Sequence, residues 1–328
     1  MKVALTFDIE FNVNHAMEPP FNRRPLGAEC VRSSDRGGPA GLDYVLAVLS
    51  EFDLRATFFI EALQSVWFGD REMGAIAERI AKAGHEVQLH VHPVWRLFDR
   101  QGWQQELSER PALAHTHDSL PALPEAELHD VLALAQSNFA RWDVPAPRAI
   151  RTGGLVVERP LYEAFRTHGL AVSSSVGLAL HVPEDEALHH YSQPFMVDGV
   201  AEFPVASYLG ADVSIRRKTR LATLIGMGSS ELSALLEAAE RAAMPGIVLL
   251  SHMSEFFRLS EEGRVRRNPV VERRFRGLCQ VLASDSGMHA VTINDLAAGP
   301  VADSAASDLP LKVGRMTSLS RFVERLAR

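Results

Sequence analysis

Two short segments carry pairs of ionisable residues whose spacing could place them on one side of a strand. Asp8 and Glu10 lie two residues apart in the first segment, and His90 and His92 lie two residues apart in the second. Side chains at positions i and i+2 of a β-strand point to the same face. Two carboxylates and two imidazoles pointing the same way from strand ends are typical of a metal site with a spare general base.

Two further polar residues follow apolar segments in the same way. Arg151 follows the short apolar segment 149–150, and His252 follows the very apolar run 247–250. Each residue taken alone also has an ordinary interpretation, as a turn, a helix cap, an ion pair or a satisfied polar side chain. Because four separate strands would have to place polar groups in the same way by chance, we favour one shared site.

The residue types fit metal-assisted hydrolysis. Two neutral imidazoles and one carboxylate leave open positions for water and substrate, which is compatible with Zn²⁺, Fe²⁺ or Co²⁺. Such a metal lowers the pKa of bound water to about 7 and polarises a carbonyl. The remaining carboxylate can take the proton from that water, and a histidine outside the metal shell can protonate the leaving group. An arginine beside the base keeps it ionised and fixes its orientation.

The elements that must position these residues alternate between short apolar strands and amphipathic helices. We predict strands at 3–7, 56–60, 87–91, 149–150, 170–174, 201–205, 247–252 and 290–293. We predict helices at 42–49, 73–80, 128–142, 158–168, 232–239 and 271–282. This alternation predicts an α/β fold, a distorted (β/α) barrel of about seven strands, whose strand ends converge on one mouth. A doubly wound open sheet is the alternative, but no Gly-x-Gly-x-x-Gly follows a predicted strand.

Composition sets limits on the class of protein. The chain has 328 residues, a net charge of −7 and 46% hydrophobic residues, which is ordinary for a globular protein and argues against a nucleic-acid binder. Cys30 and Cys279 are the only cysteines, too few for a disulfide scaffold or a Cys-based metal site. No secretion signal precedes the first predicted strand, and no apolar run is long enough to span a bilayer, so we expect a cytoplasmic location.

We divide the chain into a barrel domain, residues 1–299, and a tail, residues 300–328. The tail begins with Ala, Asp and Ser, and its apolar residues then have helical spacing: Leu319, Phe322, Val323 and Leu326. It is therefore predicted to be a linker followed by a short C-terminal amphipathic helix. We expect this helix to dock against the barrel rather than to anchor in a membrane.

Long segments at 12–40, 93–123 and 176–200 interrupt the alternation of strands and helices. Loops of this length are uncommon unless they are functional, and the loops after barrel strands build the active-site face. Variable surface decoration is the alternative for each.

Several motifs together resemble those of a known enzyme family. They occur in the family's order: Thr6-Phe7-Asp8, Arg55-Ala-Thr-Phe-Phe59, Gly84-His85-Glu86 leading to His90, Arg151, and Leu250-Ser251-His252. Over about residues 1–296 the chain resembles the polysaccharide deacetylases, the NodB-homology or carbohydrate esterase 4 superfamily. The resemblance implies a distorted (β/α) barrel and metal-dependent removal of acetyl groups from sugars.

The resemblance also implies roles for individual residues. Asp8 would be the base, His90 a metal ligand, Arg151 the residue that orients the base, and His252 the acid.

Two departures from the family pattern concern the metal ligands. The family has a second Asp where this chain has Ile9, so that Glu10 looks like the displaced ligand. The family has a second metal-binding histidine where this chain has Val94, so that His92 would replace it as a ligand. The predicted metal ligands are therefore Glu10, His90 and His92. We expect one divalent ion, with zinc favoured over iron or cobalt.

The leading hypothesis is a metal-dependent hydrolase that removes an acetyl group from an N-acetylated sugar, in cell-surface polysaccharide biosynthesis. The substrate would be a saccharide or a nucleotide- or lipid-linked sugar. One alternative is a catalytically inactive, carbohydrate-binding relative, in which Trp95 and Trp103 could stack on sugar rings. Another is a deformylase or amidohydrolase that acts on a different sugar amide.

Overall fold

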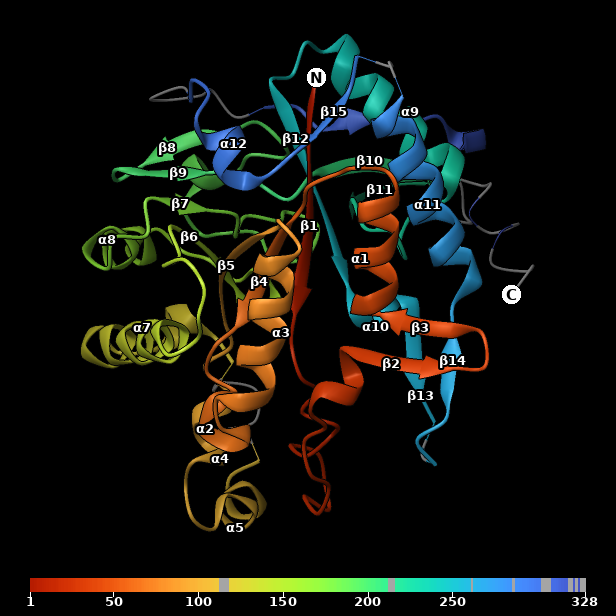
Figure 1. Ribbon diagram of the computed structural model, residues 1–328. Helices are drawn as coiled ribbons and strands as arrows, with labels where there is room; N and C mark the ends of the chain where they lie inside the picture. The colour runs from red at the N-terminus through yellow and green to blue at the C-terminus, as the bar shows by residue number, and fades with distance from the viewer. Residues whose placement is uncertain are drawn as a thin grey trace.

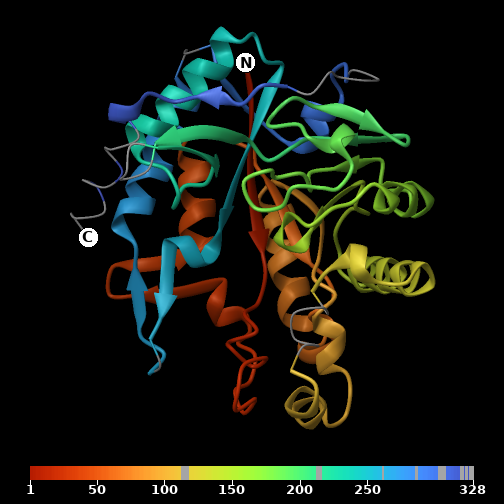
Figure 2. The same cartoon turned by 180° about the vertical axis from the view of Figure 1, so that it is seen from behind.

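A curled, mainly parallel sheet forms the centre of the computed structural model, which describes residues 1–111, 118–211, 216–260, 262–284, 287–301, 308–317, 321 and 324. The strands lie in the order β12-β1-β4-β5-β6-β7-β9-β8, with β15 also paired to β1. Their bounds are β1 Lys2–Ile9, β4 Thr57–Glu61, β5 Glu86–Val91, β6 Ala149–Thr152, β7 Val172–Ser173, β8 Phe195–Val197, β9 Val200–Glu202, β12 Gly246–His252 and β15 His289–Val291. Figures 1 and 2 show β1 running through the middle of the molecule beside β12.

Backbone contacts between the two ends of the sheet curl it into a barrel. Val205, just after β9, forms a parallel bridge with Val248 of β12, and Thr223 forms one with Leu250. The Ala206 amide donates to the Val248 carbonyl at 3.0 Å. The barrel is distorted near its start, because β15 pairs with Lys2–Ala4 of β1 and β4 pairs with Thr6–Ile9. The predicted distorted (β/α) barrel is confirmed.

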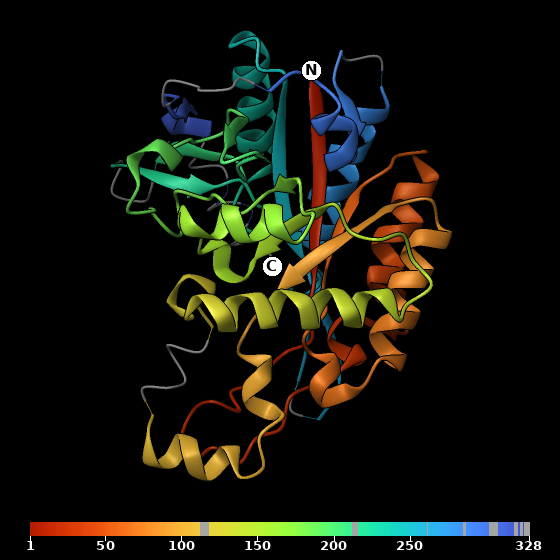
Figure 3. The ribbon, with the colours of Figure 1, turned by 90° about the vertical axis from the view of Figure 1, so that its left-hand side faces the viewer.

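Amphipathic helices cover the outside of this sheet (Figures 1 and 3). The long ones are α1 Leu42–Glu51, α3 Arg71–Lys82, α7 Glu125–Ala140, α8 Pro160–Thr167, α9 Ser229–Arg241 and α11 Pro269–Ala283. Each overlaps a helix predicted from apolar spacing. In α3, for example, the predicted stripe Met73, Ile76, Ala77 and Ile80 is buried. Burial of this apolar stripe explains why such segments fold as helices on the sheet.

The strand predicted at 170–174 is shorter than expected, because a side chain takes over part of its hydrogen bonding. Only Val172–Ser173 pair with β6 as a strand. The Ser175 and Val176 amides donate instead to Oε1 of the buried Glu202, at 2.8 and 2.9 Å. A side-chain acceptor therefore turns the backbone away from the ladder at this point.

The segments 12–40 and 93–123 contain short elements of their own. The first includes the 3-10 helix η1 (Ala28–Cys30) and the hairpin of β2 (Arg32–Asp35) and β3 (Gly38–Gly41). The second includes α4 (Trp95–Phe98), α5 (Trp103–Glu109) and the 3-10 helix η2 (Leu120–Ala122). A second hairpin, β13 (Phe257–Leu259) with β14 (Val265–Arg267), follows the short helix α10 (Met253–Phe256). Figure 1 shows these elements around the lower end of the barrel, with α2 (Ser65–Phe68).

The described residues of the tail pack against the barrel domain. The strand β16 (Leu311–Lys312) pairs with β10 (Ser207–Ala211), which also pairs with β11 (Arg217–Leu221). Arg321 lies 3.0 Å from Glu231 of α9, and both side chains are buried. The apolar positions predicted for the C-terminal helix, Leu319, Phe322, Val323 and Leu326, lie outside the described residues. The boundary between residues 299 and 300 stays a prediction.

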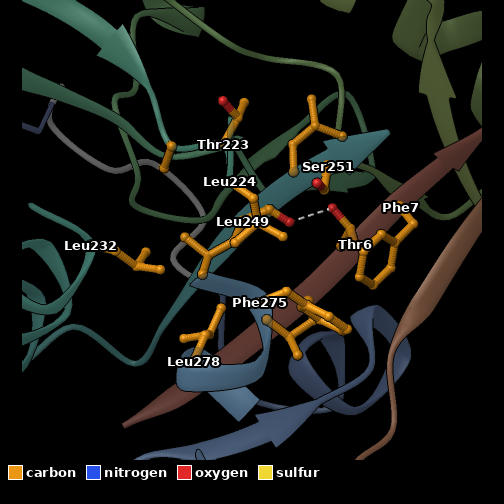
Figure 4. A pocket seen from close by; sticks show the side chains of 12 residues that line it. Thr6, Phe7, Thr223, Leu224, Leu232, Leu249, Ser251, Phe275 and Leu278 are labelled. Atoms are coloured by element: carbon orange, nitrogen blue, oxygen red, sulfur yellow. Dashed lines mark hydrogen bonds between the residues drawn. The ribbon is translucent and has the colours of Figure 1, made fainter. Parts of the chain in front are cut away.

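A small void lies among apolar side chains of β1, β12 and α11 (Figure 4). Its volume is about 10 Å³, and the Thr6 hydroxyl beside it donates to the Leu249 carbonyl at 2.7 Å. A space of this size could hold about one water molecule. It is a packing defect rather than a ligand site. Separately, none of the helices in the described parts of the chain has the length and apolar character needed to cross a lipid bilayer.

His85 should make the stability of the fold depend on pH. Burial, aided by the Arg55 charge, lowers the pKa of His85 to about 4, against about 6.5 in an unfolded chain. The unfolded state therefore binds the extra proton between these values, so the free energy of unfolding falls as pH falls from about 6.5 to about 4. Between pH 7 and pH 4.5, the free energy of unfolding should fall by about 2 kcal/mol less in His85→Gln than in the unmodified protein. Urea denaturation at the two pH values measures this difference. Equal slopes for the two proteins would contradict the assignment.

Candidate metal and catalytic site

The carboxyl ends of β1, β5, β6 and β12 meet at the lower end of the barrel in Figure 1. In the register of the sheet, Asp8 lies opposite His252 and His90 lies opposite Arg151. The structure brings together all six residues predicted to form the site: Asp8, Glu10, His90, His92, Arg151 and His252.

Glu10, His90 and His92 form a group with the composition of a metal site. The Nε2 atoms of His90 and His92 lie 3.8 and 3.4 Å from the two oxygens of Glu10. Nδ1 of His90 lies 2.8 Å from the Arg151 carbonyl oxygen, to which it can only donate. In the neutral ring Nε2 then carries the lone pair, and this nitrogen is buried with no hydrogen-bond partner among the described residues. The residues fit a divalent ion, because their donor atoms lie close enough together to share one and this nitrogen has no other partner among the described residues.

His92 is held by two neighbouring residues. Its Nδ1 lies 2.9 Å from both carboxylate oxygens of Asp118, a residue of the 93–123 segment. The same ring packs against Gly153, where an added Cβ atom would overlap Nδ1. Asp118 thus directs Nε2 of His92 towards Glu10, and Gly153 leaves the room that the ring needs.

Asp8 is fixed by a fully buried arginine. Nη1 of Arg151 donates to Asp8 Oδ1 at 2.7 Å, while its Nε and Nη2 donate to the carbonyl and hydroxyl oxygens of Ser174, each at 2.9 Å. The guanidinium also lies 4.1 Å from the ring centroid of Phe59. This network leaves Asp8 Oδ2 directed towards the site, 3.7 Å from Nε2 of His252.

His252 is paired with Glu255, which the sequence analysis left unassigned. Glu255 Oε1 lies 3.2 Å from Nδ1 of His252 and accepts from its amide at 3.1 Å, while Oε2 accepts from the Ser251 hydroxyl at 2.9 Å. Burial alone would lower the pKa of His252, but Glu255, Asp8 and Glu10 raise it to about 9. His252 is therefore suited to carry a proton on Nε2 at neutral pH.

Glu61 is a second carboxylate that the sequence analysis missed. It ends β4, lies opposite His90 in the sheet and is fully buried. Burial raises its pKa to about 7, although His92 and His90 act in the opposite direction. By contrast, burial tends to raise the pKa of Glu10, but His92, His90 and His252 lower it overall. Glu10 is therefore the more strongly ionised of the two.

A cavity of about 220 Å³ opens onto these groups, bounded by the segments 12–40 and 93–123. Its lining residues include Asp8, Glu10, His92, Asp118, His252, Phe11, Val13, Met17 and Cys30. The segment 176–200 borders a separate cavity through His181, whose Nε2 lies 2.9 Å from Glu158. Two of the three long segments predicted to be functional therefore reach the candidate site.

Asp118→Asn is expected to weaken metal binding about 10- to 100-fold, because it removes the carboxylate that orients His92. Gly153→Ala should weaken it similarly, since its methyl group displaces the same ring. Competition with a chelating dye measures both affinities, and thermal melts of the metal-free proteins check the fold. Unchanged affinity in both folded variants would contradict a role for His92 as a ligand.

Part of the chain matches a known family of deacetylases. Residues 31–173 match the family model described as polysaccharide deacetylase. A protein from Mycobacterium smegmatis assigned as a polysaccharide deacetylase has the same fold, with a TM-score of 0.58 and 17% identity over 94% of each chain. Residues 31–173 thus match the polysaccharide deacetylase family, and the fold is the one expected from the sequence resemblance.

Two further solved structures have lower TM-scores. A family 4 carbohydrate esterase from Streptomyces lividans, in complex with acetate, gives a TM-score of 0.42 at 15% identity, over 94% of this chain and 98% of the other. A CE4 family pseudoenzyme from Bacillus anthracis gives 0.44 at 12% identity, over 92% and 66%. No curated protein matches the chain significantly.

Proposed function

We propose that this chain is a metal-dependent deacetylase that hydrolyses the acetyl amide of an N-acetylated sugar. The observation that carries the proposal is Nε2 of His90, which has no hydrogen-bond partner among the described residues and lies near Glu10, His92 and Asp8. The match of residues 31–173 to the polysaccharide deacetylase family model supports the same reaction class.

Glu10, His90 and His92 would hold the divalent ion, with zinc favoured over iron or cobalt. Such an ion supplies Lewis-acid polarisation of the acetyl carbonyl and acidifies a water molecule. The protein ligands are one carboxylate and two imidazoles, which is a common set for catalytic zinc. The burial of His90 and the contacts of His92 with Asp118 and Gly153 hold these ligands in place without the ion.

Asp8 and His252 would carry the protons of the reaction. Asp8 Oδ2 accepts a proton from the attacking water, whose oxygen forms the new bond to the acetyl carbon. Arg151 donates to Oδ1 of Asp8 and leaves Oδ2 free. Nε2 of His252 then gives its proton to the sugar nitrogen as the carbon–nitrogen bond breaks. The products are acetate and an amino sugar.

The aromatic residues that could have supported a sugar-binding pseudoenzyme are not available for stacking. Trp95 and Trp103 are only 1% and 3% exposed, and they pack against Phe98 in α4. Trp95 borders the site cavity, but neither ring has an exposed face on which a sugar could stack. A saccharide or a nucleotide- or lipid-linked sugar remains the substrate class that we propose, in cell-surface polysaccharide biosynthesis; the cytoplasmic location stays a prediction.

Acetate release from N-acetylglucosamine oligomers and from nucleotide-linked N-acetyl sugars tests the proposal. The protein is assayed as purified, after chelation, and after reloading with Zn²⁺, Fe²⁺ or Co²⁺. We expect acetate release that chelation abolishes and metal restores. Release of formate from an N-formyl sugar, without acetate release, would instead support a deformylase, and no release of either acid after reloading would contradict the proposal.

A further inference from the structure

The mouth of the barrel contains a second group of potential metal ligands. Asp8, Glu10 and His252 each offer a donor atom, and these atoms lie within 4.8 Å of one another, as do those of Glu10, His90 and His92. The two groups overlap at Glu10. Its Oε1 lies near both His90 and His252, whereas its Oε2 lies near His92.

The donor atoms of Asp8, Glu10 and His252 are spaced as suitably for an ion as those of Glu10, His90 and His92. Donor atoms bound at 2.0–2.1 Å with tetrahedral angles lie about 3.4 Å apart. Nε2 of His252 lies 3.5 Å from Glu10 Oε1 and 3.7 Å from Asp8 Oδ2. The corresponding separations from Glu10 in the first group are 3.8 Å for His90 and 3.4 Å for His92. No large movement of side chains is therefore needed to place an ion in either group.

The outer contacts of the second group also resemble those of metal ligands. Glu255 faces Nδ1 of His252, so that its Nε2 can carry the lone pair when an ion competes with the proton. Arg151 occupies Oδ1 of Asp8 but leaves Oδ2 open. Glu10 could bridge two ions, as carboxylates do in sites with two metals.

The surrounding charges predict the order of filling. The first group is backed by the Asp118 carboxylate on His92, which favours a cation. The second also has a carboxylate behind its histidine, Glu255 on His252, but it lies beside the Arg151 guanidinium as well, 2.7 Å from Asp8, which disfavours a cation. The first group should therefore fill at lower metal concentration.

We propose that Asp8, Glu10 and His252 form a second, weaker divalent-cation site that inhibits the enzyme when it fills. An ion there occupies Asp8 Oδ2 and His252 Nε2, the two atoms to which we assign proton transfer. The inhibition rests on the proposed function, whereas the site itself rests on geometry alone. Activity should rise with the first equivalent of metal and fall as the second binds. At free metal ten times above the weaker Kd, about one tenth of the activity should remain.

Equilibrium dialysis of the metal-free full chain against increasing Zn²⁺, followed by elemental analysis, tests the site directly. We expect two ions per chain, one tight and one weak. His252→Ala should retain only the tight ion, and His92→Ala should lose it. His181→Ala is the matched control, because His181 is also a partly buried histidine paired with a carboxylate, Glu158, outside both groups. It should bind both ions, and thermal melts check that each variant folds.

The outcomes separate this proposal from the proposed function. Saturation at a single ion, with acetate release intact, would overturn the second site and leave the deacetylase standing. Two ions in His252→Ala would also overturn it, because the weak ion would then lie elsewhere. Two ions without loss of activity would overturn the inhibition. No bound ion in the unmodified protein would contradict the deacetylase as well.

Discussion

Replacing Asp8 with asparagine is expected to lower kcat for acetate release by about 10²- to 10⁴-fold. The amide keeps an oxygen that can accept from Arg151, so that the buried hydrogen-bond network persists. It cannot take a proton from water, which is the role that we assign to Oδ2. Steady-state kinetics of the metal-loaded variant measures the loss, which should fall on kcat rather than on KM.

Glu158→Gln is the matched control for this substitution. Glu158 is likewise a carboxylate held by a basic partner, since Nε2 of His181 lies 2.9 Å away, but it borders a different cavity. Its kcat should stay near that of the unmodified protein. If Asp8→Asn retained the same kcat as this control, Asp8 would not be the base.

The second large effect is expected from His252→Ala, which should lower kcat by about 10²-fold or more. The loss should depend on pH with a definite sign. A histidine that must donate a proton is active below its pKa, so activity should fall as pH rises through that value. Carboxylates raise the pKa of His252 to about 9, and a bound dication nearby would move the midpoint lower without changing the sign. The alanine variant should lack this alkaline decline.

Glu255→Gln separates proton donation by His252 from the effect of Glu255 on the pKa of that histidine. It keeps His252 but removes the carboxylate that raises the imidazole pKa, so the alkaline decline should begin at lower pH. Measuring kcat from pH 6 to about 10 for the three proteins tests this. An alkaline decline that persisted unchanged in His252→Ala would assign the proton to another group.

The positions of the six predicted site residues follow from two regularities that can be recognised in a sequence. Residues i and i+2 share a face of a strand, which pairs Asp8 with Glu10 and His90 with His92. Parallel strands expose their carboxyl ends at one mouth, which brings Arg151 and His252 to them. Glu61 obeys the same rule, since it directly follows the apolar run 58–60, and it could have been found in the same way.

Other features depend on irregular backbone that leaves no periodic signal. Asp118 reaches His92 from a segment between α5 and α7, and no spacing relates the two residues. The closure of the barrel depends on bridges at Val205 and Thr223, outside any regular strand. Trp95 and Trp103 were expected in an open loop, but the short helices α4 and α5 turn them inwards.

The most direct test of the account is the metal content of the purified protein after dialysis, with Glu10→Ala and His92→Ala measured in parallel. We predict about one tightly bound zinc, iron or cobalt ion per chain, lost in both variants, as expected for a site with three protein ligands. A folded, unmodified protein that binds no metal, even after zinc, iron and cobalt are supplied, would contradict it.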